Sequence, residues 1–159
     1  MGITFAATVA GCGLLGSQPT DVAGAPKIVQ EMVALAPAGS KVTVTHASDD
    51  PFGGYKAFWG WSFVADDPPS AVAAYRTWFT EQGIPLSTAD ANGAPLTATD
   101  VVVAVPGVSL GIWVPPVHGS VEQPMVDGER TWQDVELPGD TVVGRVDDTS
   151  ITADGDLLR

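Results

Sequence analysis

Alternation of apolar and polar residues predicts two adjacent β-strands near the start of the chain. Residues 41–46 (KVTVTH) place valines on one face and threonines on the other, which is the two-residue period of a strand. Residues 55–64 (YKAFWGWSFV) carry an aromatic row on one face, while Phe58 and Val64 make the other face partly apolar too. A strand that is apolar on much of both faces is typical of the interior of a sheet. We therefore expect 55–64 to lie centrally.

Two other segments have the spacing of amphipathic helices. Pro26 opens the first, and its apolar stripe runs through 28–35 until a proline stops it. The second begins with Asp67 as a natural N-cap and Pro68 at the first helical position. It should end at Gly83, since glycine takes the left-handed conformation that closes a helix.

The second half of the chain reads as a succession of strands. Residues 101–105 and 108–114 predict a hairpin turning at Pro106-Gly107. Weaker strand patterns occur at 131–137, 141–146 and 150–152, whereas the proline-rich segment 115–128 predicts a long surface loop over a groove. Helices followed by hairpin-like strands indicate an α+β fold. We predict a two-layer sandwich in which two helices cover an antiparallel sheet of about five to seven strands.

Composition restricts the possible partners. The chain has 159 residues, of which 45% are hydrophobic, and this suits a single folded domain, expected over 26–159. Nineteen acidic residues against seven basic ones give a net charge of −12. Because phosphate binding needs a basic patch, we expect no nucleic-acid partner and no direct adsorption to anionic lipid. A single cysteine excludes an internal disulfide and a cysteine-rich metal site.

The stretch before this domain has a different character. No charged residue occurs in 1–16, and Val9-Ala10-Gly11-Cys12 places the only cysteine after an apolar run that ends in small residues. This motif resembles the lipobox of bacterial lipoproteins, and the layout is similar to that of small envelope lipoproteins of high-GC Gram-positive bacteria. The resemblance implies a signal peptide over 1–11, lipid attachment at Cys12, cleavage before it, a flexible tether over 12–25, and location on the outer face of the cell membrane.

Alternatives to this interpretation remain open at the level of the sequence. The apolar run lacks the positively charged segment that precedes it in a signal peptide, so either translation starts upstream or the run is not a signal. It is also shorter than the roughly 20 apolar residues of a spanning helix, which disfavours an uncleaved anchor. An ordinary strand or helix at the start of the domain is the third reading.

One motif suggests catalysis, but its surroundings contradict it. Gly107-Val108-Ser109-Leu110-Gly111 matches G-x-S-x-G, in which Ser109 would be the nucleophile of a hydrolase. That motif needs a strand before the serine and a helix after it. Here Ser109 lies inside an alternating strand pattern, so we interpret it as an ordinary sheet residue and assign no catalytic residue.

Metal and cofactor sites are weakly indicated. His46 and His118 are the only histidines, and a zinc site would need both together with carboxylates. Asp147-Asp148 and Asp154-Gly155-Asp156 resemble oxygen-rich calcium loops but lack the carboxylate spacing of an EF-hand. We read them as acidic turns, and we predict neither a metal nor a cofactor.

Tryptophans are the best candidates for ligand contacts. Trp59 and Trp61 share one face of the aromatic strand, where they could stack a ligand or form the core between sheet and helices. Trp113 has the opposite parity to Leu110 and Ile112, so it should be the exposed aromatic of its strand. We predict binding at Trp113 first, with Trp59 and Trp61 as further candidates.

These observations lead to one function and two alternatives. The expected function is a non-catalytic, membrane-tethered envelope domain that binds a protein partner or a small ligand, because an anchor precedes a well-patterned domain without a coherent catalytic set. The first alternative is an envelope hydrolase using carboxylates that the fold brings together. The second is a carrier of lipid or another apolar molecule, which would need a sizeable apolar cavity between sheet and helices.

Overall fold

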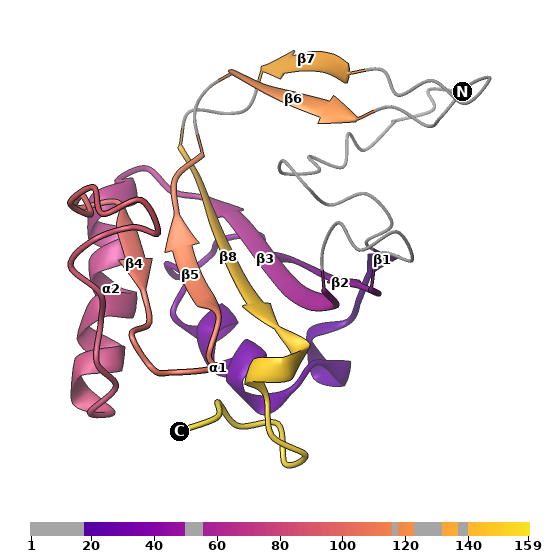
Figure 1. Cartoon of the computed structure of the whole chain (residues 1–159). Coiled ribbons are helices and arrows are strands. Elements are labelled where there is room, and N and C mark those ends of the chain that lie inside the picture. The colour runs from indigo at the N-terminus through magenta and orange to yellow at the C-terminus, as the bar shows by residue number, and fades with distance from the viewer. Residues whose placement is uncertain (1–17, 50–55, 116–117, 123–131, 137–139) are drawn as a thin grey trace.

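A computed structural model describes residues 18–49, 56–115, 118–122, 132–136 and 140–159 of the chain (Figure 1). Two helices and eight strands are present in these residues. The helices are α1 (Lys27–Ala34) and α2 (Pro68–Glu81). The strands are β1 (Gln18–Pro19), β2 (Thr43–Ala47), β3 (Phe58–Val64), β4 (Asp100–Val102), β5 (Leu110–Trp113), β6 (His118–Glu122), β7 (Trp132–Glu136) and β8 (Thr141–Asp147).

The main sheet is antiparallel throughout and has the strand order β1-β2-β3-β8-β5-β4. Both helices contribute to the core cluster on one face of it, through Ile28, Val29 and Met32 of α1 and through Val72, Tyr75 and Phe79 of α2. The predicted α+β fold, an antiparallel sheet covered by two helices, is therefore confirmed (Figure 1).

The aromatic strand β3 occupies the interior of the sheet, as its two apolar faces indicate. It pairs with β2 on one side and with β8 on the other. Trp61 and Phe63 point to the helices and are each 2% exposed, and Phe58 is buried on the opposite face beneath the guanidinium of Arg145, 3.9 Å from its ring. Burial of side chains on both faces explains the near-continuous apolar sequence.

The two ends of α2 follow the predicted capping residues. The Asp67 carboxylate accepts hydrogen bonds from the backbone N–H and the hydroxyl of Ser70, and Pro68 opens the helix. Gly83 has a φ of +69°, and the N–H of Ile84 donates to the carbonyl of Phe79 at 2.9 Å. Ile84 is buried. This is the closing pattern that a C-terminal glycine permits.

Part of the segment expected to be a tether belongs to the folded domain. Gln18 and Pro19 form β1, which pairs with β2, and residues 22–24 form a short 3-10 helix capped by Asp21. The N–H of Thr20 also donates to Val44 at 2.9 Å. The tether predicted over 12–25 is thus shortened at its C-terminal end. The signal peptide 1–11 and Cys12 lie outside the described residues.

Two other expectations need correction, and one weak strand pattern is confirmed. His118–Glu122, within the predicted surface loop, is strand β6 and pairs with β7 in a separate two-stranded sheet. The strand expected over 141–146 is confirmed as β8, which lies between β3 and β5 in the main sheet, where its glycine fits against an aromatic ring. The strand expected over 150–152 is reduced to a single bridge between Ile151 and Leu157, because residues 148–150 form a 3-10 helix.

Both edges of the main sheet are blocked within the described part of the chain. On the β4 side, the N–H of Ser87 donates to the carbonyl of Val102 at 2.8 Å, and the N–H of Ala104 donates to Pro85 at 2.8 Å. The opposite edge is the two-residue strand β1, half of which is a proline without an N–H. Neither edge offers a long row of free backbone groups.

The described helices are also short relative to a bilayer. None of them is long and apolar enough to cross a membrane.

Candidate functional site

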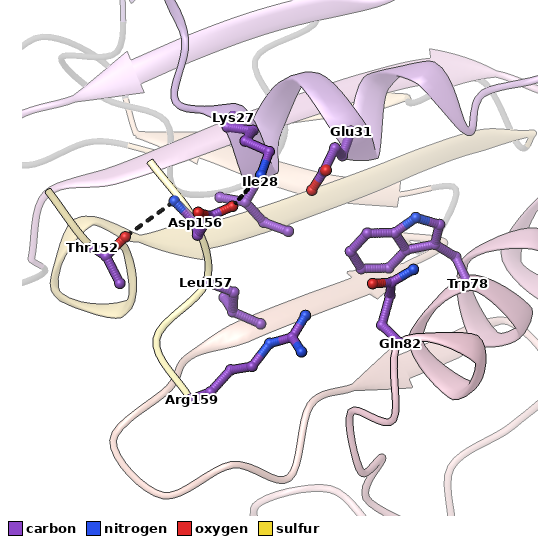
Figure 2. A pocket seen from close by; sticks show the side chains of 9 residues that line it. All are labelled: Lys27, Ile28, Glu31, Trp78, Gln82, Thr152, Asp156, Leu157 and Arg159. Carbon is purple, nitrogen blue, oxygen red and sulfur yellow. Dashed lines mark hydrogen bonds and ion pairs between the residues drawn. The ribbon is translucent and has the colours of Figure 1, made fainter. Parts of the chain in front are cut away.

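A cavity of about 470 Å³ opens where α1, α2 and the C-terminal segment meet (Figure 2). Its volume lies within the range of sites that hold small molecules. Six of the nine lining residues are polar or charged, and the other three are apolar. The lining comprises Lys27, Ile28, Glu31, Trp78, Gln82, Thr152, Asp156, Leu157 and Arg159.

The C-terminal wall is held in place by contacts with the start of α1. The carbonyl of Gly155 accepts a hydrogen bond from the N–H of Ile28 at 2.8 Å, and the Lys27 ammonium donates to Asp156 at 2.7 Å. Gly155 has a φ of +84°, and a Cβ there would lie 2.8 Å from the backbone nitrogen of Lys27. Only glycine therefore permits this close approach between the turn and the helix.

Within the wall itself, a compact turn fixes Asp156. The N–H of Thr152 donates to the carbonyl of Asp156 at 2.8 Å, and the N–H of Asp156 donates to the hydroxyl of Thr152 at 3.2 Å (Figure 2). Leu157, the next residue, is only 5% exposed and joins the core cluster. The wall is thus anchored on both the helix and the core.

The opposite wall comes from the last turn of α2. Trp78 packs partly against the core and meets Phe79 edge to face, with ring centroids 5.2 Å apart and an interplanar angle of 83°. Its indole projects toward the cavity, and the amide of Gln82 lies beside it (Figure 2). One turn of helix separates these two residues, so they line the same face.

Charges in the cavity divide into a paired and an unpaired set. Hydrogen bonding to Asp156 and its negative charge raise the pKa of Lys27, Glu31 raises it further, and Arg159 lowers it. Lys27 and Asp156 neutralise one another. In contrast, the side chains of Glu31, Gln82 and Arg159 have no hydrogen-bond or ion-pair partner in the structure of the described residues. The cavity therefore presents one carboxylate, one guanidinium and one amide to a ligand.

The structure separates the three tryptophans predicted for ligand contacts. Trp61 is 2% exposed, and its N–H donates to the hydroxyl of Tyr75 at 3.3 Å, so it belongs to the core. Trp59 is half-buried and stacks on His46 with centroids 4.4 Å apart. Trp113 is also half-buried and lies on the opposite face of the sheet, between Asp100 and Val143 in the register. No common site forms from these three side chains.

Other sequence candidates are likewise dispersed. Ser109 precedes β5, and its N–H donates to the hydroxyl of Ser150 at 2.7 Å. The elbow motif requires a helix after the serine, whereas a strand follows it here. His46 hydrogen-bonds Asp148 at 2.9 Å, while the side chain of His118 and the whole of Cys12 lie outside what the structure describes. Among the described residues, no group of three or more His, Cys, Asp or Glu side chains could hold a metal ion.

The chain matches no protein-family model, no curated protein and no solved structure. Its function must therefore be argued from the cavity. Sequence reasoning placed Trp78 on the helix but did not identify it as a binding residue. The sequence signals a shared site for Trp78 only through its position one helical turn before Gln82. The acidic and basic residues of the cavity, Glu31 and Arg159, lie more than 100 residues apart in the chain, so no local pattern links them.

Proposed function

We propose that the chain is a non-catalytic binding domain for a small polar ligand, tethered to the outer face of the cell membrane. The observation that supports ligand binding is the cavity between α1, α2 and the C-terminal segment. In this cavity, unpaired polar groups converge beside an indole. Binding sites combine apolar surface with a few placed polar groups in this manner. Gln82 and Arg159 are exposed and Glu31 is half-buried, so a ligand would replace the water around these groups with direct hydrogen bonds.

The tether rests on the pattern Val9-Ala10-Gly11-Cys12 and on the position of β1. Only residues 13–17 separate Cys12 from Gln18, the first residue of the sheet. At about 3.5 Å per residue, that link spans at most roughly 20 Å. A lipid on Cys12 would therefore keep the β1 edge close to the bilayer surface.

The two alternative functions receive less support from the cavity. A hydrolase would require two cooperating carboxylates, but Asp156 is committed to Lys27 at 2.7 Å, which leaves Glu31 as the unpaired one. A carrier of apolar molecules would require an apolar lining, whereas six of the nine lining residues are polar or charged. A small polar ligand fits the lining better than either.

Native mass spectrometry of the full chain, incubated with a mixture of free amino acids, dipeptides, hexoses and short-chain amines, tests the binding proposal. We expect at least one class to be retained. Gln82→Trp should block the cavity and abolish retention, while Glu81→Trp, an exposed neighbour that does not line the cavity, should leave it unchanged. Equal retention by the chain and by Gln82→Trp, or no retention at all, would overturn a binding function for this cavity.

The tether is tested separately by the intact mass and membrane partition of the protein expressed in a bacterium with lipoprotein processing. We expect loss of residues 1–11 and a gain of mass equal to a diacylglyceryl group or more. Both changes should disappear in Cys12→Ala. An unmodified chain that stays in the soluble fraction would refute the anchor while leaving the ligand test unaffected.

A further inference from the structure

We propose that the ligand of this cavity is a zwitterion, namely a free amino acid or a short peptide with an apolar side chain. Its ammonium would lie between the carboxylate of Glu31 and the indole of Trp78, and its carboxylate would meet the guanidinium of Arg159. This inference rests on the binding function proposed above, and it specifies the chemistry of what is bound.

The lining of the cavity keeps one unpaired charge of each sign. Four charged side chains reach the cavity, and two of them, Lys27 and Asp156, form an ion pair with each other at 2.7 Å. One negative and one positive group remain, Glu31 and Arg159. Figure 2 shows Glu31 projecting from α1 on one side of the indole and Arg159 reaching in from the C-terminal segment on the other. A complementary ligand therefore carries one charge of each sign.

A second observation places both charges in a common electrostatic environment. Glu31 raises the pKa of the Lys27 ammonium, and Arg159 lowers it. Both groups thus act on the same point at the rim of the cavity. Glu31 and Arg159 also line the same cavity of about 470 Å³, so a single small molecule bound there can contact both.

Ligands with a single charge, or with none, fit less well. An anion would meet Arg159 but would also face Glu31 and a chain whose net charge is −12. A cation would make no charged contact with the guanidinium, and a neutral ligand would make a charged contact with neither group. Only a zwitterion offers a partner to each.

The remaining lining indicates an apolar side chain on the ligand. The apolar surface that a ligand can contact comes chiefly from the half-buried ring of Trp78, since Ile28 and Leu157 lie behind it and are 1% and 5% exposed. An ammonium beside Trp78 gains a cation–π attraction in addition to its contact with a carboxylate. Arg159 can bind a carboxylate through two parallel hydrogen bonds.

Isothermal titration of the full chain with L-leucine, L-leucyl-L-leucine, isopentylamine, 4-methylpentanoate and glucose tests the assignment. Isopentylamine lacks the carboxylate of leucine, and 4-methylpentanoate lacks its ammonium. We expect the tighter-binding zwitterion to bind about tenfold more tightly than either singly charged analogue. Each analogue lacks one of the two charged groups and therefore loses one charge-assisted contact. Glucose should not bind.

Two variants assign the charges to their residues. Glu31→Gln should weaken zwitterion binding about tenfold without weakening that of 4-methylpentanoate, and Arg159→Gln should weaken zwitterion binding without weakening that of isopentylamine. Glu81→Gln and Lys41→Gln, exposed charges outside the cavity, are the matched controls and should change nothing.

The outcomes separate this inference from the function beneath it. Two results would overturn the claim that the ligand is a zwitterion but leave the cavity a binding site. One is binding of glucose that Gln82→Trp abolishes, and the other is binding of a singly charged analogue as tight as that of the zwitterions. Zwitterion binding that neither Glu31→Gln nor Arg159→Gln weakens would overturn the charge assignment. Failure of every class of compound, here and in the mass spectrometry, would overturn the binding function itself.

Discussion

Two tryptophans on neighbouring layers, Trp61 in β3 and Trp78 in α2, show how differently this domain uses the same side chain. Trp61 is 2% exposed, donates its N–H to Tyr75, and packs so closely on Gly144 of the adjacent strand that no Cβ would fit there. Trp78 is half-buried, packs on Phe79 by its edge, and lines a cavity. One ring completes the core, whereas the other forms part of a surface at which polar groups remain unpaired.

The comparison shows that polar groups are paired within the protein around Trp61 and unpaired around Trp78. Around Trp61 the two polar atoms of the aromatic pair bond to each other, and burial raises the pKa of the Tyr75 hydroxyl by disfavouring its charged form. Around Trp78 an acid, a base and an amide are left without partners in the described chain. Stability resides in the first region, and recognition is proposed for the second.

Truncating each ring is the strongest way to break this comparison. Trp61→Ala should destabilise the domain by about 3–5 kcal/mol, since it removes a fully buried aromatic side chain and leaves a cavity. Trp78→Ala should cost about 1 kcal/mol, because its ring is only partly buried, but it should abolish zwitterion binding. Urea unfolding followed by far-UV circular dichroism, together with titration of L-leucine, measures both effects. Equal losses of stability would contradict the division of roles.

Gly144 tests the close packing beneath Trp61. A Cβ at this position would lie 2.1 Å from two atoms of the indole ring, so the ring or the strand must shift. We expect Gly144→Ala to destabilise the domain by about 3 kcal/mol, because overpacking forces side chains off their preferred rotamers. Gly111→Ala is the matched control on β5, where the nearest atom would be 3.5 Å away. Comparable melting temperatures for the two variants would show that Trp61 is not tightly enclosed.

The smallest expected effect concerns the ion pair at the rim of the cavity. Lys27 and Asp156 are 59% and 49% exposed, so Lys27→Gln should lower the melting temperature by only about 1 °C at pH 7. Because the pKa of Lys27 is raised on folding, the stability it adds is present below its ordinary pKa of 10.5 and is lost as the pH rises through the higher folded value. Differential scanning calorimetry of both proteins between pH 7 and 12 should show this difference disappear at high pH, and a difference that grows instead would be inconsistent with it.

The fold could be predicted from the sequence because its signals are local. Alternating residues define β2 and β3, and Asp67 and Gly83 define the ends of α2, each within a few residues of the chain. The position of β8 was less evident. Its glycine weakens the strand pattern, although that glycine is what allows β8 to lie beside the indole of Trp61.

The candidate site could not be predicted because nothing local defines it. Glu31, Trp78 and Arg159 belong to separate elements and meet only after the C-terminal turn docks on α1 through Gly155. Parity arguments correctly place Trp113 away from Leu110 and Ile112, but they cannot say whether a ring faces a ligand. Convergence of unpaired groups is a property of tertiary structure, and a one-dimensional pattern does not contain it.

The blocked edges of the sheet acquire a particular meaning under the lipid anchor proposed at Cys12. Anchored chains would share a thin layer, in which neighbours collide far more often than they do when free in three dimensions. Exposed strand edges would then join copies into ribbons. The cover that Ser87 and Pro85 provide on one side, and the proline of β1 on the other, would keep crowded copies apart as individual molecules, each with its own cavity open.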